Sequence, residues 1–551
     1  MSRLSFAGSE ELAGAWQERL AFLRDPASYA DGGDKVECIE THISWVFLTK
    51  RYAYKLKKPV SFGFVDFSTR ERRHEACREE LRLNQRLAPD VYQGLTPLTI
   101  DRQGRRRLGG PAAVDEWLVR MRRLPADRCL ARMIDERTVT QRDVGLLADR
   151  LWEFYRALPP VPCRADDYRR SIERHLEDNE RELNEAPFLS EGRVQRVLAK
   201  QRRALMLTPE MFDVRVCDGR VVEAHGDLRP EHVYFAPKPV VIDALEFSRE
   251  LRTIDVLDEL SFFAMECAVA DAPDVGTQVV QRYQDAAHDR PPPELSAFYE
   301  SYRALVRAKV AALRAAQAPW DSPAAAAGRN AAMRYVAWAD QRLERLYRPL
   351  RIVVLGGSGA GKSTVASELA RTLGGYRLGT DAFRRFEMGE SPESTPMMPA
   401  QAATHSFGRG RYSPEERARI YRLVRESAVA ALPRRSTVVV DGTYGDPVER
   451  RLLFDAAQVA AADVAFIECR CPLETARERV AARHAAHESE IRPEWLEQQA
   501  RDRMPLADDL PAVVIKTTGR LEATVEEAVL TLRNLLRTTP RNERTTAIPA
   551  P

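Results

Sequence analysis

The sequence lacks long apolar runs, closely spaced cysteine pairs and a large net charge. No uninterrupted apolar stretch reaches the ~20 residues that a membrane-spanning helix needs, and Met1 to Trp16 do not have the pattern of a signal peptide. The eight cysteines include no C-x-x-C pair, which argues against a zinc site or a disulfide framework. A net charge of +3 gives no sign of a surface for nucleic acid or membranes. These absences predict a cytoplasmic protein without a membrane or nucleic-acid partner.

What is present describes a large globular chain. Its 551 residues exceed what one hydrophobic core supports, so two or three domains are expected. The step Arg348-Pro349-Leu350 separates a helix-rich stretch from a new apolar strand and is the best predicted boundary. Residues 538–551, rich in Pro, Thr and Arg, are predicted to form a disordered tail.

The most specific motif is the run G-G-S-G-A-G-K-S-T at 356–364, which matches the phosphate-binding P-loop pattern G-x-x-x-x-G-K-[ST]. An apolar strand precedes it and a helical stretch follows it. Glycines let successive backbone N–H groups point at a phosphate, and the helix N-terminus adds a partial positive charge. We expect the lysine to reach the β- and γ-phosphates of ATP and the serine to bind Mg²⁺. The expected binding residues are Gly356, Gly361, Lys362, Ser363 and Thr364.

Residues 350–537 are predicted to form an α/β domain with a parallel sheet. Strands expected at 352–355, 376–380, 437–441, 464–469 and 512–517 alternate with helices. Asp441 ends an apolar strand, as a magnesium-shell carboxylate of P-loop proteins does. Asp381 ends the second strand, and this part of the chain resembles small-molecule P-loop kinases of the gluconate- and shikimate-kinase type, which implies that Asp381 faces the acceptor as the general base. Arg479 and Arg483 share one helix face, and their helix resembles the lid helix of these kinases, which implies that they stabilise the transferring phosphoryl group. A solvated basic face is an equally good interpretation of this pair.

A second constellation lies earlier in the chain. The segment His225-Gly226-Asp227 to His232, followed by Ile242-Asp243, resembles the H-G-D-x-x-x-x-N and I-D motifs of aminoglycoside phosphotransferases, which have a protein-kinase-like fold. The resemblance implies that Asp227 is the catalytic base and Asp243 a metal ligand. His232 stands where the family has a metal-binding Asn, and imidazole suits Mg²⁺ less well than oxygen does. We expect Asp255 and Asp258 to tie the next helix to this segment.

The segment Tyr52-Ala53-Tyr54-Lys55 resembles the V-A-I-K strand of kinases, although no Gly-rich loop precedes it. By the resemblance, Lys55 binds the α- and β-phosphates and pairs with a Glu on the following helix. Glu80 is the better candidate and Glu79 the alternative. The implied fold for 1–348 is an α+β, bilobal kinase-like domain, with an N-lobe at about 30–122 and a C-lobe at about 123–348.

Taken as a whole, the chain resembles bacterial fusions of an aminoglycoside-phosphotransferase-like domain with a predicted P-loop kinase of the AAA and zeta-toxin-like type. This predicts a bifunctional kinase that uses ATP and Mg²⁺ to phosphorylate a hydroxyl of a small molecule, such as a sugar or amino sugar. One alternative is a P-loop kinase regulated by a catalytically weakened N-terminal module, which His232 favours. Another is a P-loop enzyme acting on nucleic-acid ends or nucleotide-sugars, and the modest net charge argues against nucleic acid.

Overall fold

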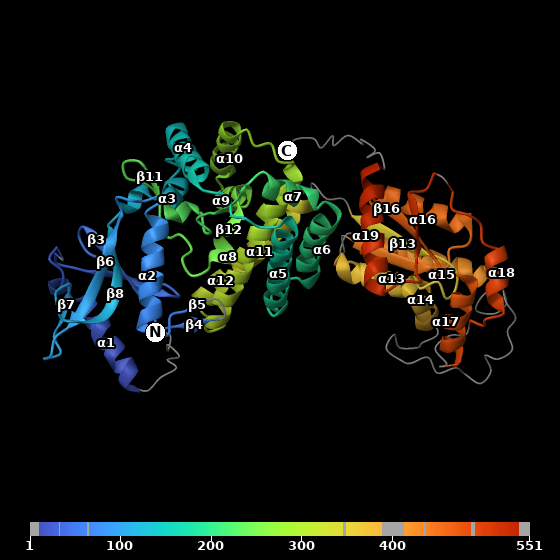
Figure 1. Cartoon of the computed structure of the whole chain (residues 1–551), viewed down its shortest axis with the longest axis horizontal. Helices are drawn as coiled ribbons and strands as arrows, with labels where there is room; N and C mark the ends of the chain where they lie inside the picture. The colour runs from blue at the N-terminus through green and yellow to red at the C-terminus, as the bar shows by residue number, and fades with distance from the viewer. Residues whose placement is uncertain are drawn as a thin grey trace. The chain divides into compact units, whose positions relative to one another are not determined.

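The computed structural model describes residues 10–31, 33–62, 65–344, 349–387, 413–432, 437–485, 491–507 and 509–538. Except for Thr538, the predicted disordered tail lies outside these ranges. The chain divides into two compact units, one of Met1–Ala165 with Val214–Arg303 and one of Asp166–Asp213 with Ala304–Pro551 (Figure 1). Among the helices that the structure describes, none combines the length and hydropathy that crossing a membrane requires.

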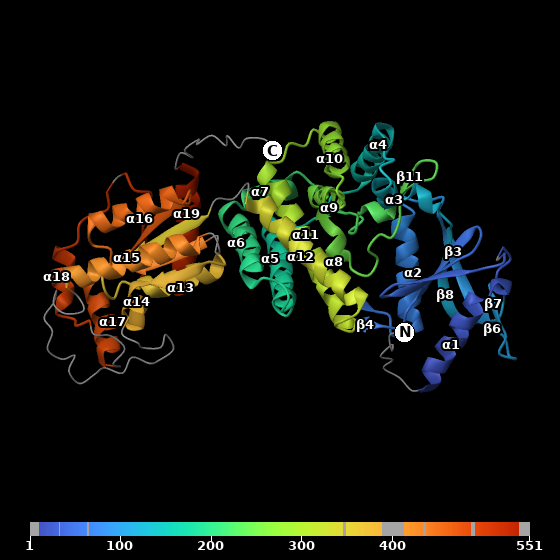
Figure 2. The same ribbon diagram turned by 180° about the vertical axis from the view of Figure 1, so that it is seen from behind.

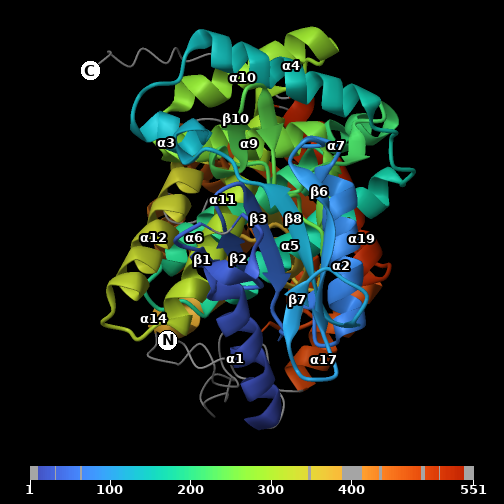
Figure 3. The same cartoon turned by 90° about the vertical axis from the view of Figure 1, so that its left-hand side faces the viewer.

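The first unit begins with a six-stranded antiparallel sheet in the order β1-β2-β3-β8-β6-β7 (Figure 3). Its strands are β1 Glu37–Glu40, β2 Ser44–Leu48, β3 Tyr52–Lys57, β6 Tyr92–Ile100, β7 Arg106–Leu108 and β8 Ala113–Arg122. The sequence predicts strands at 36–40, 44–49, 52–57 and 116–122, where β-branched and aromatic residues concentrate, and these correspond to β1, β2, β3 and β8. The prediction missed β6, which contains Gly94 and Pro97, two residues that lower strand propensity.

Helix α2, Arg70–Asn84, packs against β6 and β8 and carries Glu80 towards β3. The sequence predicts a capping box that begins at Ser68. In the structure the cap is Thr69, whose hydroxyl accepts the Arg72 N–H at 3.3 Å, and Ser68 instead donates to Asp66 at 2.6 Å. Helix α1, Glu10–Arg24, adds Trp16 and Leu23 to the core at the outer part of the sheet.

The rest of the first unit is mainly helical around one apolar core. Its elements are η1 Pro26–Ser28, β4 Ser61–Phe62, β5 Val65–Asp66, η2 Ala126–Arg128, α3 Leu130–Asp135, α4 Gln141–Ala157, β9 Val221–Glu223, η3 Pro230–His232, β10 Val233–Phe235, β11 Pro239–Val241, α8 Arg249–Arg252, β12 Thr253–Asp255, α9 Val256–Val269 and α10 Pro273–Ala287. The sequence predicts a strand-rich stretch over residues 214–242, and β9, β10 and β11 lie within it. The first four residues differ, because Val214 to Cys217 complete helix α7, Glu210–Cys217.

The second unit contains a parallel sheet in the order β14-β15-β13-β16-β17. The strands are β13 Leu350–Leu355, β14 Tyr376–Gly379, β15 Thr437–Gly442, β16 Asp463–Arg470 and β17 Ala512–Lys516, as the sequence predicted. Successive β13 residues enter two different cores, because strand side chains alternate between faces. Ile352 and Val354 pack with α13 and α19, whereas Val353 and Leu355 pack with α15 and α16 (Figure 2).

The helices of this α/β part are α13 Lys362–Thr372, α14 Thr380–Glu387, α15 Pro414–Ala431, α16 Pro447–Val459, α17 Leu473–Ala485, α18 Trp495–Arg501 and α19 Leu521–Thr538. Of these, α14 and α18 were not predicted. Both are short, with eight and seven residues, so neither shows the extended periodicity by which a helix is found in sequence.

Helices α5 Ala165–Asn184, α6 Glu191–Leu207, α12 Pro323–Glu344 and the end of α11 Pro293–Gln317 also lie in the second unit. Leu207 joins the core under α13 and α19, and Arg533 of α19 donates to the Met206 carbonyl at 3.0 Å. The predicted domains, 1–348 and 350–537, therefore differ from the compact units. Whether residues 1–348 and 350–537 each fold alone stays a prediction.

Candidate functional site

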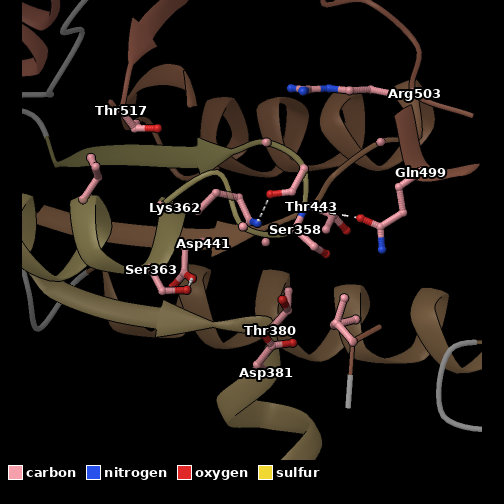
Figure 4. A pocket seen from close by; sticks show the side chains of 18 of the residues that line it. Ser358, Lys362, Ser363, Thr380, Asp381, Asp441, Thr443, Gln499, Arg503 and Thr517 are labelled. Carbon is pink, nitrogen blue, oxygen red and sulfur yellow. Dashed lines mark hydrogen bonds between the residues drawn. The ribbon is translucent and has the colours of Figure 1, made fainter. Parts of the chain in front are cut away.

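A cavity of about 850 Å³ lies at the P-loop in the second unit (Figure 4). It is lined by the loop itself and by residues from α14, α15, α16, α17 and α18. Every residue that the sequence singled out in this half of the chain lines the cavity: Gly356, Gly361, Lys362, Ser363, Thr364, Asp381, Asp441, Arg479 and Arg483. Their roles in binding or catalysis stay predictions, but the fold brings them to one place.

The P-loop glycines are required by close packing. A Cβ at Gly356 would lie 2.5 Å from the Cys469 carbonyl oxygen, and one at Gly359 would lie 2.5 Å from the Ala476 carbonyl oxygen. Gly361 caps α13 with a φ of 79°, in the left-handed region that favours glycine. The loop therefore sits tightly against β16 and α17, and no side chain of its own comes between its backbone and the cavity at these positions.

Lys362 is the first residue of α13, and its amine lies inside the cavity lining. Nζ donates to the Gly357 carbonyl oxygen at 2.7 Å, and within the described ranges the amine forms no ion pair with a carboxylate. Burial lowers the pKa of Lys362, because the desolvated amine has only distant carboxylates to offset the loss of water. An anionic ligand would restore the favourable environment of this charge.

Ser363 and Asp441 form the expected pair, with Ser363 Oγ donating to Asp441 Oδ2 at 2.8 Å. Sequence reasoning missed Arg377 on β14, which holds the same carboxylate through Nε at 2.8 Å and Nη2 at 3.2 Å. The register pairs Gly379 with Asp441, and a Cβ at Gly379 would lie 2.9 Å from Asp441 Oδ1. The missing side chain of Gly379 leaves room for this arginine, and no sequence signal pointed to it.

The remaining predicted residues differ in how firmly they are held. Arg479 donates to the Thr517 carbonyl oxygen at 2.8 Å, whereas the contact of Arg483 among the described residues is a long one, with the Arg479 carbonyl oxygen at 3.4 Å. Asp381 is the second residue of α14, is 73% exposed and pairs with Arg384 at 2.5 Å. Gln499 of α18, which the sequence did not indicate, accepts the Ser358 N–H at 3.3 Å.

The first unit holds a second cluster of charges around β3. Lys55 Nζ lies 2.8 Å from Glu80 Oε1 and 2.5 Å from Asp243 Oδ1. Glu79, the alternative partner, pairs instead with Arg82 and Arg252. Burial by itself would lower the pKa of Lys55, but the two carboxylates raise it well above its usual value.

Sequence reasoning missed Lys57, two residues further along β3. It is 0% exposed, lies 2.5 Å from Glu80 Oε2 and also pairs with Glu246. Burial would raise the pKa of Glu80, but Lys55 and Lys57 together lower it. Glu246, which follows Asp243 by three residues, therefore forms an ion pair with Lys57. Two lysines and three carboxylates link β3, α2 and the segment after β11.

Asp227, Arg229 and His232 form a compact group. Arg229 Nη2 donates to Asp227 Oδ2 at 2.9 Å and lies 3.1 Å from His232 Nε2. His232 Nδ1 lies 2.8 Å from the Asp227 carbonyl oxygen, and Nε2 lies 3.7 Å from Asp243 Oδ2. Asp243 itself has a φ of 64°, a conformation that is costly for a residue with a side chain. The structure thus brings Lys55, Glu80, Asp227, His232 and Asp243 together.

Helix α9 is tied to this segment by a residue other than the two predicted. Glu259 accepts the N–H groups of His225 and Gly226 at 3.1 and 2.5 Å. The two predicted residues have arginine partners, Arg215 for Asp255 and Arg303 for Asp258, and their expected tie to this segment stays a prediction. Burial lowers the pKa of His225 to about 3, so this histidine is neutral at physiological pH and serves as a structural residue.

A metal at either site would rely on few protein ligands. In the parts of the chain that the structure describes, no group of three or more His, Cys, Asp or Glu side chains is arranged to hold a metal ion. Nucleotide-bound Mg²⁺ typically uses one or two protein oxygens plus phosphates and waters. Ser363 and Asp441 fit that pattern, since their oxygens are already in contact. His232 and Asp243 fit less well, because Arg229 occupies His232 Nε2.

One family model and several solved structures are similar to the part of the chain that contains the P-loop. A family model described as an AAA domain matches residues 352–506. Among solved structures, a gluconokinase from Sinorhizobium meliloti is similar to this chain, with 21% identity and a TM-score of 0.26. The match covers 35% of this chain and 95% of the gluconokinase. The APS kinase CysC of Mycobacterium tuberculosis is also similar, with 19% identity and a TM-score of 0.25. That match covers 35% of this chain and 99% of the APS kinase.

Two relatives match most of the chain. The uncharacterized proteins Rv2004c of Mycobacterium tuberculosis and Mb2027c of Mycobacterium bovis are each 31% identical to it over 457 residues. The alignments cover 81% of this chain and 86% of each relative, so they include more than the AAA domain. The chain therefore belongs to the same protein family as these mycobacterial relatives.

Proposed function

We propose that the second unit is an ATP-dependent phosphotransferase that moves the terminal phosphoryl group to a hydroxyl of a small molecule. The observation that carries this proposal is Lys362, a partly buried amine without a carboxylate partner among the described residues, beside the Ser363–Asp441 pair in one cavity. A cavity of about 850 Å³ lies within the usual range for small-molecule sites.

Each residue has a distinct part in this proposal. The P-loop N–H groups and Lys362 bind and orient the phosphates, and Arg483 stabilises charge on the group in transfer. Asp381, exposed at the cavity edge, accepts the proton of the acceptor hydroxyl through the oxygen that Arg384 does not bind. Mg²⁺, when bound near Ser363 and Asp441, neutralises phosphate charge. Arg377 keeps the Asp441 carboxylate in one orientation.

The test is ADP formation by the full chain across a panel of sugars, amino sugars and nucleosides. An accepted substrate should raise ADP formation above the rate with water alone, and Asp381→Asn should remove most of that increase. Asp455→Asn is the matched control, because Asp455 is half-exposed on α16 and pairs only with Arg451 in the structure. ADP formation that no acceptor stimulates, and that Asp381→Asn leaves unchanged, would contradict this function.

We further propose that the cluster around Lys55 is a second nucleotide site, as the resemblance to aminoglycoside phosphotransferases implies. The supporting observation is that Lys55 contacts both Glu80 and Asp243. If this site also transfers phosphoryl groups, Asp227 is its base and the protein is bifunctional. If it only binds, it regulates the P-loop site. Lys55→Ala should abolish ATP binding here, whereas Asp227→Ala should stop transfer and leave binding in place.

A further inference from the structure

Arg229 is placed where a kinase-like site would need neutralising charge. It is 8% exposed, and Nη2 contacts both the proposed base, Asp227, and the ring of His232. Its Nε is buried and has no hydrogen-bond partner among the residues that the structure describes. A buried guanidinium with an unused donor is costly, and a phosphate oxygen is a ligand that satisfies such a donor well.

His232 is held by protein groups at both ring nitrogens. Nδ1 faces the Asp227 carbonyl oxygen at 2.8 Å, which can only accept, so this nitrogen carries the proton. Nε2 then has the lone pair, and Arg229 Nη2 donates to it at 3.1 Å. A metal could use Nε2 only after Arg229 had moved. The imidazole therefore does not replace the metal-binding oxygen of the resembled family.

The carboxylates of the site are paired with fixed cations. Asp243 uses Oδ1 for Lys55, and Asp227 uses Oδ2 for Arg229. The contacts run from Lys55 to Asp243, on to His232 at 3.7 Å, and then to Arg229 and Asp227. Two cations therefore flank the site, Lys55 on β3 and Arg229 beside η3. Both are held in place by protein side chains and need no added ion. The Asp243 side chain is 45% exposed and the Lys55 side chain 10%, so the carboxylate is the part of this pair that faces solvent.

We propose that the first unit binds the phosphates of a nucleoside triphosphate without a divalent metal, with Lys55 and Arg229 supplying the positive charge. This rests on the proposed second nucleotide site and deepens it. The phosphates compete with Asp243 and Glu80 for Lys55, and with Asp227 and Glu231 for Arg229. Removing the Asp243 charge therefore strengthens binding here, whereas in a metal-dependent site it removes a metal ligand and weakens binding. His232 is a positioning residue that keeps Arg229 against Asp227.

The experiment is calorimetric titration of ATP into the full chain carrying Lys362→Ala, which disables the P-loop, once with EDTA and once with excess MgCl₂. We expect the two dissociation constants to agree within about threefold. Arg229→Gln should weaken binding in EDTA about 10- to 100-fold, the usual range for a charge-assisted hydrogen bond. Arg229→Lys should keep part of the affinity, and Asp243→Asn should keep or tighten it. Arg105→Gln is the matched control, since Arg105 is exposed and pairs with Asp101 in the β6–β7 turn.

The outcomes separate this inference from the proposal beneath it. Binding that requires MgCl₂ and is lost in Asp243→Asn overturns metal-free binding but leaves a second nucleotide site. No binding under either condition, in protein whose thermal unfolding matches the wild type, removes the second site and this inference together. Binding that Lys55→Ala and Arg229→Gln both leave unchanged lies elsewhere and also overturns the inference. Binding that becomes dependent on MgCl₂ in His232→Asn would support the inference that the His232 imidazole does not replace a metal-binding oxygen.

Discussion

The two lysines at the centre of the two proposed sites have opposite surroundings. Among the residues that the structure describes, the Lys362 amine has a backbone carbonyl oxygen as its hydrogen-bond partner, and it lines an open cavity. Lys55 lies between two carboxylates, and a second lysine, Lys57, shares one of them. Burial lowers the pKa of Lys362, whereas the neighbouring carboxylates raise the pKa of Lys55 above its usual value.

This difference shows how one residue type serves two purposes. An amine without a carboxylate partner gains most from an incoming phosphate, so the P-loop site is built to bind strongly and to respond to ligand. An amine already paired gains less, because a phosphate must displace a carboxylate that is held in place. The same pairs that weaken ligand binding in the first unit hold its sheet, α2 and the Asp243 segment together.

The largest expected effect is at Lys362. Lys362→Ala should lower ADP formation by the full chain about 1,000-fold, because the mutation removes the one positive charge at the start of α13 that faces the phosphates. Lys238→Ala, at an exposed lysine in the β10–β11 turn, is the control. The measurement is the rate of ADP formation at saturating ATP. A rate in Lys362→Ala that equals the wild-type rate would show that turnover belongs to the first unit.

The next effect concerns stability in the first unit. Lys57→Met should lower the free energy of unfolding by about 3 kcal/mol, because it leaves Glu246 buried without its partner. The double variant Lys57→Met with Glu246→Met should recover much of this loss, since replacing a whole buried pair by apolar side chains is often neutral. Urea unfolding of the wild type, Lys57→Met, Glu246→Met and the double variant gives the coupling energy between the two side chains. Additive effects would show that the two side chains do not interact.

The same network predicts a dependence of stability on pH. The pKa of Glu80 is lowered on folding, so its contribution is present above the unfolded value of about 4.3 and is lost as pH falls. The pKa of Lys57 is raised on folding, so its contribution is present below about 10.4 and is lost as pH rises past its folded value. Lys57→Met should therefore flatten the alkaline limb of the stability curve.

The second unit could be predicted well because its signals are local. Its strands are short apolar runs that end at polar residues, as in Val438 to Asp441, and its phosphate loop is a contiguous motif. A parallel sheet brings the carboxyl ends of its strands to one edge, so the motif and Asp441 had to meet. Arg377 could not be found in this way, because its role depends on the register of β14 against β15.

The first unit was harder to predict because its site is assembled from distant segments. Lys55, Glu80 and Asp243 were found through a family resemblance, since nothing in their spacing brings β3, α2 and the end of β11 together. Lys57 lies two residues after the Lys55 motif, and Arg229 occupies a variable position inside the 225–232 motif, so neither pattern specified these residues. Glu259 was missed in favour of Asp255 and Asp258, because the position that faces His225 is set by the rotation of α9.

The smallest expected effect sharpens the comparison within the P-loop site. Arg477, Arg479 and Arg483 lie on one helix, α17, but only Arg479 is fixed by a backbone carbonyl at 2.8 Å. Arg483→Gln should lower kcat about tenfold with no change in Tm, because this exposed side chain contributes to transfer and not to packing. Arg479→Gln should lower both kcat and Tm. Arg477→Gln, whose side chain pairs with Glu497 on α18, is the matched control and should change neither. Equal rates for Arg483→Gln and Arg477→Gln would show that Arg483 belongs to a solvated basic face, the interpretation that the sequence left equally open.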